Sequence, residues 1–182
     1  MNPKVLGTIG LLFLVISQVL LAQGFDFLQG QKPIDFAHWF MLSGAVLSLA
    51  FSFVFPKGII HTIATVLTVI GVIAHVGMCT IDFVLWSFGQ DMEGRDSLIF
   101  HLMDTPSIWL PFMVVGPAFL YVGLSFHAWK FIRSHTVLAI MTLLSSTLIG
   151  LGQFLFQNRL WVVVGTILFA LGLVLLAFRK EN

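Results

Sequence analysis

The segment Ile59–Phe83 reads IIHTIATVLTVIGVIAHVGMCTIDF, and most of its side chains are apolar. A helix of about 20 apolar residues crosses the hydrocarbon core of a bilayer, so this segment is long enough to span a membrane. Its polar side chains recur at steps of three and four, with Val72 as the one interruption, and so share one helix face. Buried polar groups in a membrane usually face a partner, a cavity or a cofactor. We call this set the polar stripe; it consists of His61, Thr65, Thr68, His75, Cys79 and Asp82.

The composition of the whole chain agrees with a membrane location. The chain has 182 residues, of which 58% are hydrophobic and 9% charged, and its mean hydropathy is +1.02. Soluble domains are about 25% charged, so we expect one domain embedded in the lipid bilayer over nearly its whole length. A net charge of +1 argues against a nucleic-acid-binding protein. The single cysteine, Cys79, excludes an intrachain disulfide.

Six stretches are apolar and long enough to span a membrane, which predicts an all-α bundle of six transmembrane helices. The first is longer than the apolar region of a signal peptide, so we expect it to be retained; cleavage near Ala22, which leaves five spans, is the alternative. In the connection 84–107, Asp96 and Ser97 predict the start of a short interfacial helix over Leu98–Met103. The predicted spans are 5–22, 36–55, 59–83, 108–129, 136–156 and 160–178.

The basic residues predict the orientation of the bundle. If the N-terminus is cytoplasmic, the positive charges on the outside are Lys32, Arg95 and Arg159, and twice as many lie inside. This distribution agrees with the positive-inside rule. We therefore expect a multi-pass protein of the cell membrane with cytoplasmic N- and C-termini and an outer 84–107 connection. The inside set is Lys4, Lys57, Lys130, Arg133, Arg179 and Lys180.

Other spans offer polar side chains that could meet the polar stripe. Ser43 lies on the second span, and Ser146 and Gln153 lie on the fifth. Hydroxyl groups often serve helix packing alone, whereas the ionisable His75 and Asp82 need partners. Histidine also exchanges protons near neutral pH. The leading prediction is a non-enzymatic protein that binds or conducts a small polar solute, an ion or a proton along the polar stripe.

The histidines allow a second interpretation. By depth, His61 can meet His127 near the inner face, and His75 can meet His38 toward the outer face. Two histidines 14 residues apart on one helix, each facing one on a neighbour, resemble the axial ligands of di-haem b-type cytochromes in arrangement, though not in family sequence. The arrangement departs from that pattern because two different helices supply the partners. A haem-bearing electron carrier is therefore one alternative, and a structural or accessory subunit without a site of its own is another.

Acidic side chains in the 84–107 connection support a weaker alternative. Carboxylate oxygens are ligands for divalent cations, and outer histidines could help to bind Zn²⁺ in an intramembrane zinc hydrolase. The chain has no HExxH, GxSxG, P-loop or GxGxxG motif, so we assign no catalytic residue and favour a protein that is not an enzyme. Haem b and zinc remain the only cofactors that these patterns suggest. The outer acidic set is Asp91, Glu93, Asp96, His101 and Asp104.

Overall fold

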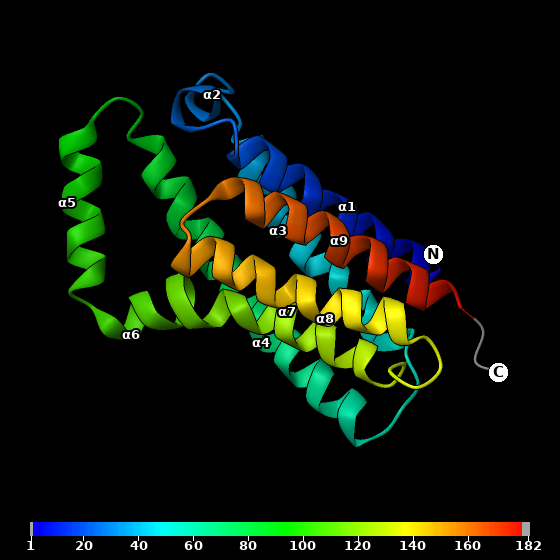
Figure 1. Cartoon of the computed structure of the whole chain (residues 1–182). Coiled ribbons are helices and arrows are strands. Elements are labelled where there is room, and N and C mark those ends of the chain that lie inside the picture. The colour runs from blue at the N-terminus through cyan, green and yellow to red at the C-terminus, as the bar shows by residue number, and fades with distance from the viewer. Residues whose placement is uncertain (1, 180–182) are drawn as a thin grey trace.

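The computed structural model describes residues 2–179, and that part of the chain forms helices and no strand (Figure 1). Three of the apolar segments each contain a short turn of different winding, a 3-10 turn in η1 and π turns in η2 and η3. The elements are α1 (Pro3–Leu21), α2 (Phe25–Gln29), α3 (Phe36–Ser48), η1 (Leu49–Phe53), α4 (Ile59–Ser87), α5 (Met92–Met103), α6 (Pro106–Trp109), η2 (Leu110–Val114), α7 (Val115–Trp129), α8 (Thr136–Gly150), η3 (Leu151–Leu155) and α9 (Arg159–Phe178).

Six helical segments in the described residues are long and apolar enough to cross a membrane, which confirms the predicted number. The third segment, α4, continues to Ser87, one turn beyond the predicted end at Phe83. The start of α1 and the end of α9 lie at the same end of the bundle, which we call the termini end, and α2 and α5 lie at the opposite, distal end (Figure 1). The cytoplasmic assignment of the termini end remains a prediction from the basic residues.

The six spans pack as three consecutive antiparallel pairs, α1 with α3, α4 with α7, and α8 with α9. Glycines allow the helices of each pair to approach closely. A Cβ at Gly10 would lie 2.7 Å from the backbone nitrogen of Ser48, and a Cβ at Gly71 would overlap the backbone of Leu120. In the third pair, a Cβ at Gly165 would lie 2.9 Å from the side chain of Ile149. Side chains larger than hydrogen at these positions would separate the helices.

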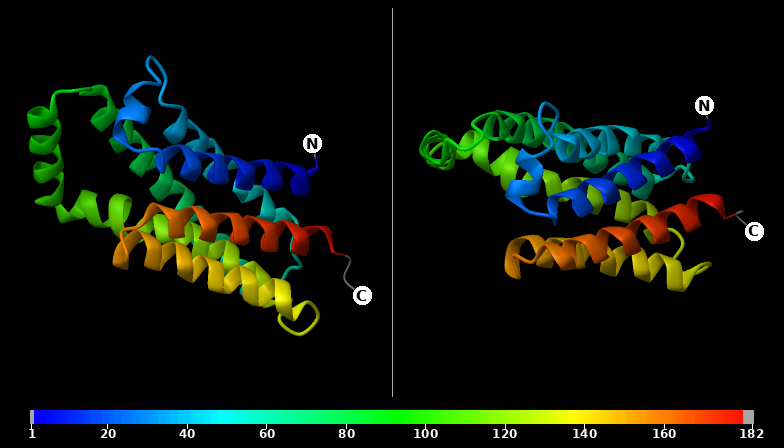
Figure 2. Two further views of the ribbon diagram at one scale, coloured as in Figure 1. Left: turned by 45° about the horizontal axis from the view of Figure 1, so that its top comes forward. Right: turned by 90° about the horizontal axis from the view of Figure 1, so that it is seen from above.

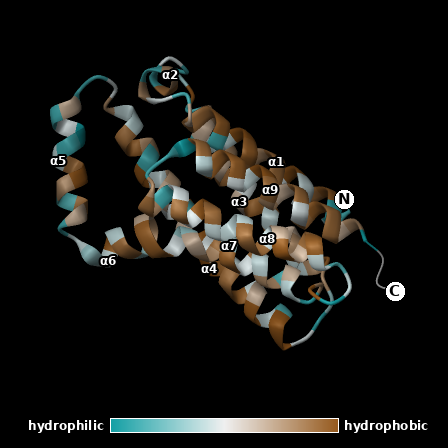
Figure 3. Cartoon of the chain, viewed as in Figure 1, coloured by the Kyte–Doolittle hydropathy of each residue, from teal (hydrophilic) through white to brown (hydrophobic). Residues whose placement is uncertain are grey.

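The surface of the bundle is apolar along the spans, whereas polar residues gather at its ends (Figure 3). Leu144, Leu155 and Leu160 are among the exposed side chains, while Leu14, Leu124 and Phe169 are buried between the helices. A soluble protein rarely exposes so much contiguous apolar surface. The exposed side chains therefore fit contact with lipid.

The helix α5 lies across the direction of the spans at the distal end (Figures 1 and 2). It begins at Met92, earlier than the predicted start near Ser97, because Asp91 provides the N-cap by accepting a hydrogen bond from the backbone nitrogen of Gly94. Asp96, the cap that the sequence predicts, lies inside the helix instead. None of the residues of α5 is buried, so this helix is an outlying part of the fold.

Candidate functional site

A cavity of about 390 Å³ lies between the spans in the distal half of the bundle, and all six spans contribute to its wall. We call it the distal cavity. The π turns η2 and η3 both border it, and such turns occur often at functional sites. The lining residues are Gln18, Leu21, His38, Met41, His75, Met78, Asp82, Met113, Pro117, Ala118, Tyr121, Val122, Ser146, Ile149, Gly150, Gln153, Phe154, Arg159 and Val162.

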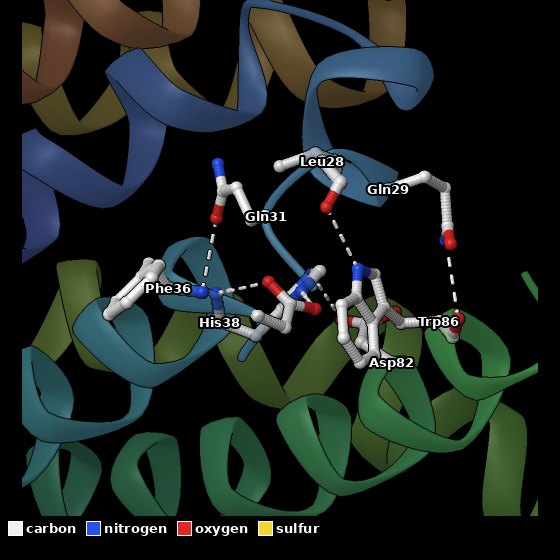
Figure 4. Close-up of polar contacts among 8 residues, drawn as sticks. Leu28, Gln29, Gln31, Phe36, His38, Asp82 and Trp86 are labelled. Atoms are coloured by element: carbon white, nitrogen blue, oxygen red, sulfur yellow. Dashed lines mark hydrogen bonds and ion pairs between the residues drawn. The ribbon is translucent and has the colours of Figure 1, made fainter. Parts of the chain in front are cut away.

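One histidine joins two carboxylates at the wall of this cavity (Figure 4). Nδ1 of His38 lies 2.5 Å from Oδ2 of Asp35, and Nε2 of His38 lies 3.4 Å from Oδ2 of Asp82. Asp35 is also the N-cap of α3, since its Oδ1 accepts a hydrogen bond from the backbone nitrogen of His38. The contact with Asp35 is a hydrogen bond, and the contact with Asp82 becomes an ion pair when the imidazole is protonated. We call these three residues the carboxylate–histidine chain.

The segment around α2 holds the carboxylate–histidine chain against α4 (Figure 4). Nε1 of Trp86 donates a hydrogen bond of 3.0 Å to the carbonyl of Leu28, and Nε2 of Gln29 donates one of 3.2 Å to the carbonyl of Trp86. The ammonium group of Lys32 lies 5.8 Å from the centre of the Trp86 ring. Trp86 follows Asp82 by one helical turn, so these contacts fix the start of α3 beside the carboxylate of Asp82.

The inner wall of the distal cavity carries hydrogen-bond acceptors. Nδ1 of His75 donates to the carbonyl of Gly71 at 2.9 Å, which leaves Nε2 as the acceptor of the neutral ring. Oε1 of Gln18 is buried and has no hydrogen-bond partner among the protein atoms described. The ring of Tyr121 lies 6.1 Å from that of His75. At the rim, Nη1 of Arg159 donates to Oε1 of Gln153 at 3.3 Å.

The structure divides the polar stripe into two parts. His75 and Asp82 line the distal cavity together with His38, Ser146 and Gln153. Thr68 and Cys79 are buried in helix packing instead, and Oγ1 of Thr68 bonds to the carbonyl of Ala64 in its own helix.

On the side of His75 that faces the termini end, the backbones of α4 and α7 are in contact. A Cβ at Gly71 would overlap the backbone of Leu120, and one at Gly123 would overlap that of Thr68. We call this contact the α4–α7 seam. His61 and Thr65 lie on its other side, toward the termini end. Ser43 lies on α3 and is not among the lining residues of the distal cavity.

His61 and His127 are neighbours at the termini end, as their depths predict, with ring centres 5.2 Å apart. When a haem iron binds two axial imidazoles, the distance between the ring centres is the sum of two iron–nitrogen bonds and half the width of each ring. That sum is larger than 5.2 Å. The pair therefore does not fit the two sides of one haem in this arrangement. On the distal side, His38 uses both ring nitrogens toward carboxylates rather than toward His75.

The outer acidic residues do not form a cluster suited to a metal ion. Within residues 2–179, His, Cys, Asp and Glu side chains form no group of three or more with such an arrangement. Asp91 caps α5, and Glu93 lies in the first turn of that helix. Asp96 and His101 belong to α5, and Asp104 ends it. The zinc hydrolase interpretation gains no support from this geometry.

Sequence reasoning missed Asp35, Tyr121 and Arg159 as members of the site. Asp35 carried a usable signal, because an aspartate directly before a helical apolar run, three residues ahead of His38, has the pattern of an N-cap. Tyr121 and Arg159 carried none, since only tertiary packing brings them to the distal cavity. Comparisons with protein-family models, with curated proteins and with solved structures find no match to this chain.

Proposed function

We propose that this protein, whose six apolar helices are compatible with an integral membrane protein, binds a small organic solute in the distal cavity. The observation that carries the proposal is the meeting of all six spans around one cavity that contains both ionisable and apolar side chains. Ligand sites in proteins have this composition, with a mostly apolar wall and a few polar groups that orient the ligand.

The polar groups of the cavity indicate the kind of solute. The carboxylate of Asp82, Nε2 of His75 and the unpaired Oε1 of Gln18 are all acceptors. A ligand that donates hydrogen bonds, such as an amine, would satisfy them. The remaining wall includes Met41 and Met78, whose flexible side chains adapt to different apolar shapes. We therefore propose an amine with a compact apolar body.

Binding is better supported than conduction. Passage along the polar stripe would have to cross the α4–α7 seam, where Gly71 lies against Leu120 and Gly123 against Thr68. The hydroxyl of Thr68 already bonds within its own helix and offers no further step for a solute. This packing supports a pocket with access from the distal half, and it separates the pocket from the termini end.

A structural or accessory subunit is the second candidate, and the hydroxyl groups favour it. Thr68, Thr142 and Thr166 each bond to the carbonyl four residues earlier, at 2.7 to 2.8 Å. Such hydroxyls act in packing, and they have no proton left to donate to a ligand. This candidate explains the threonines, but it leaves the carboxylate–histidine chain and the cavity without a role.

Cysteine accessibility distinguishes the two candidates. Cys79 is the single native cysteine, so a Cys79→Ala background allows one reporter at a time. Met78→Cys in the cavity wall is expected to react with cationic aminoethyl methanethiosulfonate faster than with the anionic sulfonatoethyl reagent. Asp82→Asn should reduce that preference, because it removes the negative charge. Thr68→Cys, fully buried in the seam, and Leu144→Cys, on the lipid-facing surface, are the matched controls.

Protection of the reporter tests the class of ligand. Benzylamine, benzyl alcohol and benzoate share an aromatic body and differ in the charge of the head group. Benzylamine should slow the modification of Met78→Cys most strongly, and benzoate least. If Met78→Cys reacts as slowly as Thr68→Cys, the cavity is closed to solutes and the structural candidate stands.

A further inference from the structure

His127, in the last turn of α7, is buried in an aromatic environment that offers it no hydrogen bond. Its side chain is 2% exposed, and the ring of Phe55 stacks on it at 5.1 Å. Neither ring nitrogen of His127 has a hydrogen-bond partner among the protein atoms described, and Nδ1 of His61 is buried and unpartnered as well. Three ring nitrogens therefore need a partner that these side chains do not provide for one another.

Leaving these nitrogens without a partner is unfavourable. A neutral imidazole has one donor and one acceptor, and a buried polar group that stays unpaired destabilises the fold. A histidine that only fills space in this aromatic pocket could be replaced by phenylalanine without that cost. The choice of histidine on both α4 and α7 at the same depth points to a shared partner that binds imidazole.

The spacing of the two rings fits a shared metal ion. Metal–nitrogen bonds of about 2.0–2.1 Å and tetrahedral angles place two coordinating imidazoles with their ring centres about 5 Å apart. The centres of His61 and His127 are 5.2 Å apart, and the ring planes are tilted by 54°. Thr65 follows His61 by one helical turn on the same face, and its buried Oγ1 also has no hydrogen-bond partner among the described protein atoms.

We propose that His61 and His127 bind a divalent transition-metal ion of the kind that prefers imidazole, such as Zn²⁺ or Cu²⁺, between α4 and α7. The hydroxyl of Thr65 and water complete the coordination. His61 is in the first turn of α4 and His127 in the last turn of α7, so the ion lies at the termini end of the bundle. The α4–α7 seam separates this site from the distal cavity, and the two sites act independently.

The test uses the full-length protein without an affinity tag, purified in detergent and treated with chelator. Titration with Co²⁺ should give the visible d–d absorption of a tetrahedral nitrogen site and saturate near one equivalent. Isothermal titration with Zn²⁺ gives the affinity. His127→Phe keeps the stacking on Phe55 and removes both nitrogens, so the affinity should fall by about tenfold or more, the loss seen even when a group that only supports a ligand is removed.

His101→Phe, on the exposed helix α5, is the control for non-specific binding and should leave the affinity unchanged. Both substitutions should also leave the modification rate of Met78→Cys unaltered, which separates this proposal from that of the distal cavity. If His127→Phe does not fold, His61→Gln replaces it in the same titration. Equal Zn²⁺ affinity in the wild type and in His61→Gln or His127→Phe would overturn the proposal and leave ordered water as the partner of the two rings.

Discussion

Nε2 of His38 lies 3.4 Å from Oδ2 of Asp82, and this contact joins the start of α3 to the distal half of α4. The same ring contacts Asp35 through its other nitrogen. Asp35 is 2% exposed, so its carboxylate depends on protein groups for its hydrogen bonds. A buried carboxylate with such partners is stabilised. Removal of either the carboxylate or the histidine leaves the remaining buried group without its partner.

The first prediction concerns Asp35. Asp35→Ala removes the N-cap of α3 and the acceptor for Nδ1 of His38, and we expect a loss of stability of about 2 kcal/mol. Asp35→Asn keeps an oxygen for either bond and should cost less. Thermal unfolding in detergent measures the difference. Asp96→Ala, on exposed α5, is the control, and equal midpoints for Asp35→Ala and Asp96→Ala would contradict the role of Asp35.

The spans and the burial of the polar stripe could be predicted from the sequence, because both depend on local pattern. The hydrophobic length of each segment is matched to the bilayer, and the three-and-four spacing fixes one face of α4. That face is directed inward, since Thr68, His75 and Cys79 are all buried. The pairing of His61 with His127 also followed from helix direction and depth alone.

The division of the stripe could not be predicted, because it depends on residues distant in sequence. The α4–α7 seam requires Gly71 to meet Leu120, and no local pattern shows which helix α4 approaches most closely. For Asp35, the position before an apolar segment indicates the N-cap of α3, whereas its burial has no local signal. Its burial results from the contacts of the α2 segment with Trp86.

The second prediction tests the seam itself. In Gly71→Ala the new methyl group would overlap the backbone of Leu120, so α4 and α7 must separate, and we expect a loss of about 3 kcal/mol. At Gly150 a Cβ meets no atom within 4 Å, and Gly150→Ala should raise stability by about 0.5–1 kcal/mol through helix propensity. Thermal midpoints of the two variants in the same detergent should move in opposite directions. Similar midpoints would mean that the seam is looser than described.

The third prediction concerns the attachment of the α2 segment. Trp86→Phe keeps an aromatic ring but removes the donor to the carbonyl of Leu28. We expect a loss of about 1 kcal/mol and faster amide hydrogen exchange in α2, with little change in α8 and α9. Trp39→Phe, on an exposed position of α3, serves as the control. Unchanged exchange in α2 would show that this hydrogen bond does not hold the segment.

The fourth prediction concerns orientation. In a Cys79→Ala background, Ser97→Cys on α5 and Ser134→Cys between α7 and α8 are both exposed. The basic residues predict that the first faces the outside and the second the cytoplasm. A membrane-impermeant maleimide applied to intact cells should label Ser97→Cys alone, and permeabilisation should add Ser134→Cys. Labelling of Ser134→Cys in intact cells would reverse the predicted topology.

The last prediction separates the distal cavity from the packed interior by adding the same group to each. Ala118→Leu places three further carbons at the wall of the cavity, where space is available, so stability should hold or rise by up to about 1 kcal/mol. Ala139→Leu adds them to a fully buried position and should cost about 1–3 kcal/mol through overpacking. Ala118→Leu should also slow the reaction of Met78→Cys with the cationic reagent, because it occupies the space that the reagent needs. If Ala118→Leu is stable and Met78→Cys no longer reacts with the reagent in that variant, the cavity is linked to binding. If Ala118→Leu and Ala139→Leu are equally destabilising, the cavity does not exist in the folded protein.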